Sequence, residues 1–209
     1  MVAIITDPFI EQDLIAKRRA MGVDKFDEVW EGVYIMAPMA NDEHQDLVSD
    51  LTTVLNIAVD WVGLGKVRPG VNVSDQEHDW QYNYRCPDVV VFLNNTQAEN
   101  RGSHWLGGPD FAIEVVSKHD RAWEKLPFYA KVGVRELMLI DRDPWKVTLY
   151  RLQDGELVEA GQSPDDHEGI LVSEIVPLNW QLVIRDDGPL IQVTHHDGQQ
   201  RWTIKPDVA

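Results

Sequence analysis

Apolar residues recur at helical spacing in the first third of the chain. The longest such stretch contains Leu47, Leu51 and Leu55, is capped by Asn41 or Asp42, and ends at Gly63 and Gly65. At roughly 20 residues it predicts a helix of about 30 Å, long enough to cover a sheet. A shorter helix is expected to open at Asp7-Pro8 and to stop near Gly22.

Three continuous apolar runs predict buried strands. They lie at Pro87–Leu93, Phe111–Val116 and Glu136–Asp141, and a helical segment from about Asp120 to Val132 separates the last two. Pro127 must kink or restart that helix, because proline cannot donate a backbone hydrogen bond.

Weaker strand signals flank this centre. Residues 28–37 predict two strands joined at Glu31-Gly32, and 67–73, which contains Pro69-Gly70, predicts a bent or edge strand. Residues 145–150 and those beyond Trp180 alternate with period two, which favours antiparallel strands, and 165–169 predicts an exposed loop.

This order of elements predicts a mixed α/β or α+β fold. We expect a single domain over residues 1–209, with a core at about 28–152 and a C-terminal β extension at about 153–209. The added strands offer edges that can pair between subunits, and this predicts a homodimer.

Composition narrows the class of protein. The chain has 209 residues, 44% of them hydrophobic, which is enough for one sizeable core. It has no apolar run near the ~18 residues of a membrane span and no visible secretory signal. Cys86 is the only cysteine, so an internal disulfide is impossible. We expect a cytoplasmic protein without a membrane partner.

Charge is unevenly distributed. Nineteen basic against 35 acidic residues give a net charge of −16, which argues against tight binding to nucleic acid. Residues 117–151, however, carry eight basic and five acidic residues, a local charge of 8 − 5 = +3. This segment predicts either a basic patch on an acidic body or an ordinary solvated helix face.

Two carboxylates interrupt the apolar runs. Asp88 stands at the entrance of one strand, and Glu114 is expected to share a strand face with Ala112 and Val116. Unpaired buried acids are costly, and a divalent cation with hard oxygen ligands is the simplest compensation. The structural alternatives are that Asp88 caps a turn and that Glu114 pairs with Arg85 or Lys118.

The order of these residues resembles a known family. Pro87-Asp88, Glu114-Val115-Val116-Ser117, Lys125, Tyr129, Gly133-Val134, Glu136 and Ile140-Asp141 are similar to the Uma-two family. Ala37-Pro38, His44 and the leucine helix match its opening part. The resemblance covers about residues 28–152 and weakens toward about 183. It implies a restriction-endonuclease-like fold of the PD-(D/E)xK nuclease superfamily.

The resemblance also implies a site. Asp88 and Glu114 would be its acids and Lys125 its lysine, because Val116 stands where the superfamily usually has lysine. Lys118 is a rival that we rank below Lys125. Mg²⁺ or Mn²⁺ would be held by Asp88, Glu114 and the backbone carbonyl of Val115. His44 matches the family's helix-start histidine and is a further candidate near the cation.

Two classes of function follow. The first is a metal-dependent endonuclease that hydrolyses phosphodiester bonds, with DNA as its substrate. The second is a catalytically silent module of the same fold that binds a partner. The acidic charge favours the second, and Asp88, Glu114 and Lys125 favour the first. Hydrolysis of another phosphoester would use the same chemistry.

Overall fold

The long apolar strands form a six-stranded central sheet. The computed structural model describes residues 8–116, 121–164 and 169–206. Within them, the order across the central sheet is β12 (Glu156–Ser163), β11 (Trp145–Gln153), β10 (Glu136–Arg142), β9 (Phe111–Val116), β6 (Val89–Leu93) and β3 (Gly65–Pro69). β9 and β10 run parallel, and the other neighbours are antiparallel. The three apolar runs thus form buried strands, as predicted, and the structure places them next to one another. β12 extends this sheet past residue 152.

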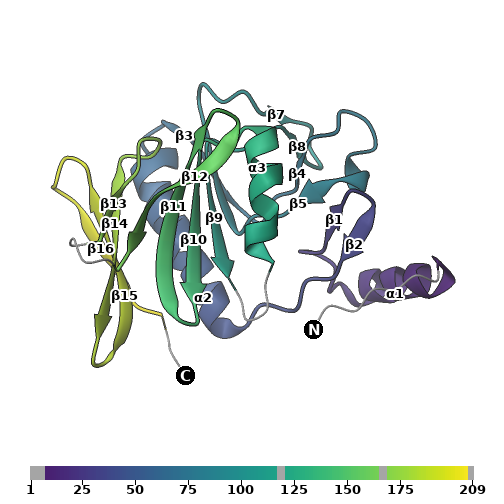
Figure 1. Ribbon diagram of the computed structural model, residues 1–209, viewed down its shortest axis with the longest axis horizontal. Coiled ribbons are helices and arrows are strands. Elements are labelled where there is room, and N and C mark those ends of the chain that lie inside the picture. Colours follow the sequence, from purple (N-terminus) through teal and green to yellow (C-terminus); the bar gives the residue numbers. More distant parts are fainter. Residues whose placement is uncertain (1–7, 117–120, 165–168, 207–209) are drawn as a thin grey trace.

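The longest helix covers one face of this sheet (Figure 1). α2 (Asp42–Leu55) continues as one π-helical turn, η1 (Asn56–Asp60). The Asn41 side chain accepts a hydrogen bond from the His44 backbone nitrogen at 3.1 Å, so the cap anchors the first turn. Leu47, Leu51 and Leu55 are fully buried against the strands. Both the predicted helix and its cap are confirmed.

A shorter helix lies on the opposite face. The chain enters it through a 3₁₀ turn, η3 (Ala122–Lys125), and continues as α3 (Leu126–Val132). Pro127 lies in the first turn of α3, so the expected restart at this proline is confirmed. Gly133 ends the helix with φ of 86°, and its backbone nitrogen donates to the Ala130 carbonyl at 3.0 Å.

Strand alternation separates two apolar cores. Val89 and Val91 of β6 pack with Ile113 on the α2 face. Val90 and Ala112 pack with Tyr129 of α3 on the other face. Since β9 alternates in the same way, the face predicted for Glu114, beside Ala112 and Val116, is the one that α3 covers.

A side sheet of short strands lies beside α3 in Figure 1. Its order is β2 (Val33–Ile35), β1 (Glu28–Trp30), β5 (Tyr84–Arg85), β4 (Val73–Ser74), β8 (Trp105–Leu106) and β7 (Glu99–Asn100). A 3₁₀ turn, η2 (Trp80–Tyr82), precedes β5. The hairpin at Glu31-Gly32 is confirmed. The bent or edge strand predicted over 67–73 is confirmed at its start, because β3 is an edge strand of the central sheet. The chain then turns at Gly70, where φ is 56°, and residues 73–74 form β4 of the side sheet.

The C-terminal strands form a third sheet. Its order is β13 (Ile170–Val172), β14 (Leu178–Arg185), β15 (Gly188–His195) and β16 (Arg201–Ile204). Trp180 and Ile191 pack into the core under α2. β13 and β16 are its edges, and a homodimer formed through them stays a prediction.

The N-terminal helix α1 (Pro8–Met21) projects away from the sheets (Figure 1). Its bounds match the predicted helix. No helix among the described residues has the length and apolar character needed to cross a bilayer.

Candidate active site

The register of two antiparallel strands places the predicted acids together. Val89 of β6 pairs with Ile113 of β9, so the next pair outward is Asp88 with Glu114. Asp88 Oδ2 accepts a hydrogen bond from the Val115 backbone nitrogen at 2.7 Å. The Asp88 side chain thus sits at the strand end where β9 finishes, and it is fixed in orientation by the neighbouring strand.

The first turn of α2 approaches the same aspartate. His44 Nε2 lies 3.2 Å from Asp88 Oδ1, and the Asp88 side chain remains 18% exposed. His44 Nδ1 is buried and has no hydrogen-bond partner among the described residues. The predicted histidine, His44, therefore contacts the predicted acid, Asp88, and the contact is made by its Nε2 atom.

Glu114 is buried and faces α3. The Lys125 ammonium lies 3.1 Å from both Glu114 Oε1 and Oε2, and the Tyr129 hydroxyl donates to Oε1. Glu114 and Lys125 are 3% and 7% exposed. Burial raises the pKa of Glu114 to about 8, while the charge of Lys125 opposes the rise and the charge of Asp88 adds to it. In this chain the partner of Glu114 is Lys125, rather than Arg85.

Glu28 is a further acid at this site that the sequence pattern did not predict. This residue of β1 is 5% exposed, and its Oε1 lies 3.0 Å from the Lys125 ammonium. An acid within a short apolar strand is the same type of signal as Asp88. The sequence gives no indication, however, that β1 packs against η3.

Tyr129 belongs to the residues that match the family pattern, and the sequence predicted no role for its hydroxyl group. Its hydroxyl reaches Glu114, and burial, together with the charge of Glu114, raises the pKa of Tyr129 well above its ordinary value. Tyr129 therefore stays protonated and acts as a hydrogen-bond donor to the carboxylate.

The other candidates lie differently. Val115 reaches the site through its backbone nitrogen, and its carbonyl as a ligand stays a prediction. Lys118 lies outside the described residues. Arg85 is buried with its guanidinium over the rings of Trp30 and Phe128, at 4.6 and 4.3 Å from their centroids.

Two arginines of the basic segment have acidic partners. Arg121 Nε donates to Glu124 Oε1 at 2.7 Å, and Arg142 lies 2.9 Å from Glu43 Oε2. Glu124 is already among the five acidic residues of segment 117–151, so of these two contacts only the one with Glu43 offsets part of the segment's net charge of +3.

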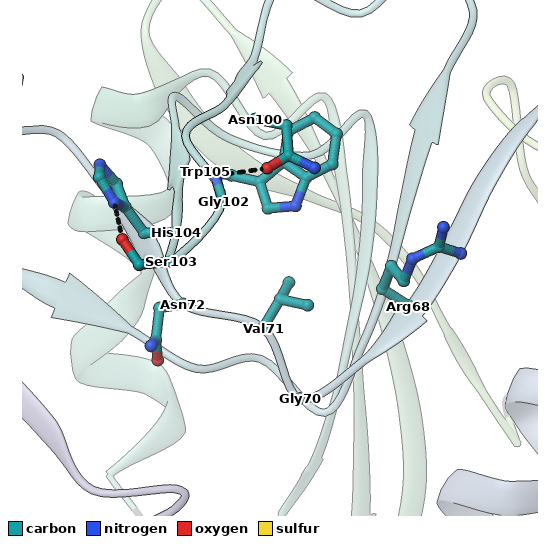
Figure 2. A pocket seen from close by; sticks show the side chains of 9 residues that line it. All are labelled: Arg68, Gly70, Val71, Asn72, Asn100, Gly102, Ser103, His104 and Trp105. Carbon is teal, nitrogen blue, oxygen red and sulfur yellow. Dashed lines mark hydrogen bonds between the residues drawn. The ribbon is translucent and has the colours of Figure 1, made fainter.

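The pocket in Figure 2 is lined by residues other than the acids and Lys125. It has a volume of about 280 Å³ and is lined by Arg68, Gly70, Val71, Asn72, Asn100, Gly102, Ser103, His104 and Trp105. The Gly70 backbone nitrogen donates to the Asp88 carbonyl at 3.0 Å, so the pocket wall adjoins the strand end. Because neither the acids nor Lys125 line the pocket, we place the chemistry at the carboxylate cluster instead.

The donor set suits a hard divalent cation. Glu114 and Glu28 contact the Lys125 ammonium, and the charge of Asp88 acts on Glu114 from the neighbouring strand end. Two close acids are most easily kept ionised by a cation between them. Among the described residues, no three His, Cys, Asp or Glu side chains form a metal-binding group. Asp88 and Glu114 offer two carboxylates, and Mg²⁺ needs one or two while it keeps several waters.

Comparisons with known proteins support the fold. A crystal structure described as a putative nuclease of the DUF820 family from Anabaena variabilis ATCC 29413 superposes with a TM-score of 0.55. It is 22% identical and covers 69% of this chain and 79% of its own. The similarity shows a shared nuclease fold, which confirms the predicted restriction-endonuclease-like core. No curated protein matches this chain.

The family profile of Uma2, described as putative restriction endonuclease, matches residues 24–185. This range contains the region that carried the resemblance to the Uma-two family, and it includes β1, both acids and the lysine. The chain therefore belongs to the Uma2 family.

Proposed function

We propose that this protein is an endonuclease that hydrolyses phosphodiester bonds of DNA and depends on Mg²⁺ or Mn²⁺. The observation that carries the proposal is the convergence of Asp88, Glu114 and Lys125 at one strand end. Membership of the Uma2 family supports a nuclease, and the site chemistry supports a cation and a phosphodiester.

Asp88, Glu114 and the backbone carbonyl of Val115 would hold the cation. When bound, the ion supplies Lewis-acid activation of a phosphoryl oxygen and of water. Asp88 suits this role because the Val115 backbone nitrogen orients one of its oxygens, and the side chain keeps some exposure. Its second oxygen faces His44, which we propose steadies the carboxylate rather than taking part directly.

Lys125 would stabilise the negative charge that develops on the phosphoryl group. Its ammonium is fixed by buried carboxylates, so it is positioned before substrate arrives. While protonated it cannot accept a proton from water. We therefore propose that Lys125 provides charge stabilisation and orients the attacking water.

A binding module is the second candidate. It is favoured by the net charge of −16 and by the acidic partners of Arg121 and Arg142. Such a protein would use the same fold without cutting DNA.

Incubation with plasmid DNA separates the two. With Mg²⁺ or Mn²⁺ we expect conversion of supercoiled plasmid to open and linear forms, and we expect EDTA to abolish it. Product forms are read on agarose gels, with duplex, single-stranded and branched DNA tested in parallel. The endonuclease proposal fails if none of these substrates is cut and neither ion shifts the melting temperature.

A further inference from the structure

Lys125 lies between two buried carboxylates from different parts of the fold. Its Nζ is 3.1 Å from Glu114 of β9 and 3.0 Å from Glu28 of β1. The three side chains are 9%, 4% and 6% exposed, so water offers the ammonium little compensation. Among the residues that the structure describes, this lysine therefore contacts two carboxylates, of which Glu114 belongs to the predicted nuclease motif and Glu28 does not.

Glu28 is itself fixed in position. Its Oε1 accepts a hydrogen bond from the Cys86 backbone nitrogen at 2.8 Å, and its Oε2 accepts one from Trp30 Nε1 at 2.6 Å. The Trp30 ring in turn contacts the guanidinium groups of Arg85 and Arg121, which lie 4.6 and 4.8 Å from its centroid. Glu28 is therefore held in place from the chain segment that leads into Asp88.

A bound cation would affect the two carboxylate partners of Lys125 differently. A cation held by Asp88 and Glu114 would compete with Lys125 for the Glu114 oxygens. It would not touch Glu28, whose oxygens already face Lys125, Cys86 and Trp30. With three N–H donors, the ammonium can give up a Glu114 contact and keep the one to Glu28.

We propose that Glu28 is a positioning residue that keeps Lys125 at the site when a divalent cation takes up oxygens of Glu114. This inference rests on the proposed function. Glu28 would thereby give β1 a part in the chemistry. Without Glu28, the buried Lys125 ammonium would stay on Glu114, where its positive charge would repel the divalent cation.

Glu28→Gln tests the proposal by Mn²⁺ affinity, measured by calorimetry without DNA. We expect affinity to fall about 10-fold or more, as for other residues that orient a metal site from its surroundings. Cleavage is expected to fall through kcat, with KM for plasmid near the wild-type value. Glu136→Gln is the matched control. Glu136 is 1% exposed and pairs with Arg151 at the opposite end of the central sheet, so its loss should change stability but not Mn²⁺ affinity.

Two further variants separate position from charge. Glu28→Asp keeps the charge but shortens the reach, and we expect Mn²⁺ affinity below that of the wild type. In a Lys125→Met background, Glu28→Gln is expected to change the affinity by less than about 2-fold, because its partner is gone.

Wild-type affinity in Glu28→Asp would mean that the charge of Glu28 matters and its position does not. An undiminished effect in the Lys125→Met background would mean that Glu28 acts without Lys125. Either result overturns the proposal. If Lys125→Met does not fold, Glu28→Asp decides alone. If the wild type binds Mn²⁺ and cuts DNA but Glu28→Gln is unchanged, this inference fails while the proposed function stands. A wild type that binds no Mn²⁺ overturns both.

Discussion

Replacing Asp88 by Asn is expected to lower DNA cleavage by about 10³-fold or more. Asparagine has the same shape and still accepts the hydrogen bond from the Val115 backbone nitrogen, so the fold should lose no more than about 1 kcal/mol. What the variant removes is the negative charge that faces the proposed cation. Initial rates of plasmid nicking at saturating Mg²⁺ measure the loss, and thermal melting reports the fold.

Asp110 supplies the matched control for this change. Its Oδ2 accepts a hydrogen bond from the Leu93 backbone nitrogen at 2.8 Å, much as Asp88 accepts one from Val115, but it lies at the other end of β9. We expect Asp110→Asn to cut DNA at the wild-type rate. Equal rates for the Asp88 and Asp110 variants would remove Asp88 from the chemistry.

Replacing Lys125 by Met is expected to destabilise the protein by about 3–5 kcal/mol well above pH 8, because it leaves two buried carboxylates without their shared cation. Methionine fills a similar volume, so loss of packing contributes little. Urea denaturation of both proteins across a pH series measures the difference. Cleavage is expected to be lost as well.

The pH dependence of this loss follows from Glu114. Burial already raises the pKa of Glu114 to about 8 from an ordinary value of 4.5, so the folded state holds the proton more tightly than the unfolded chain. Stability linked to this group is therefore complete below about pH 4.5 and is lost as pH rises toward 8. Without the positive charge of Lys125, the pKa of Glu114 should rise further, so the loss of stability with rising pH should be larger. The difference between the variant and the wild type should be small in acid and large above pH 8, and a difference independent of pH would contradict this account.

The parts of the site that depend on local sequence pattern could be predicted from the sequence. The acids were visible because Asp88 and Glu114 interrupt apolar strands, and period-two alternation gave the face of Glu114. Pro127 marked the start of α3, which fixes Lys125 at its N-terminal end. Lys125 itself was selected by resemblance to a family, and Lys118 ranked below it because Lys118 shares the face of Glu114 only if the strand continues past Ser117.

What escaped prediction depends on packing between distant segments. Glu28 reaches Lys125 only because β1 pairs with β5 and so lies beside η3, and strands of two or three residues are too short for periodicity to show. The contact between His44 and Asp88 likewise joins a helix start to a strand end across the sheet. The side sheet and the division of residues 67–73 were missed for the same reason.

The most direct test of the account is the position of a bound cation. Crystals grown with Mn²⁺, and measured for the anomalous scattering of that ion, are expected to show one peak coordinated by both Asp88 and Glu114, with Lys125 remaining against Glu28. The account is contradicted if no peak appears at this position, or if the ion is coordinated by only one of the two carboxylates or by neither.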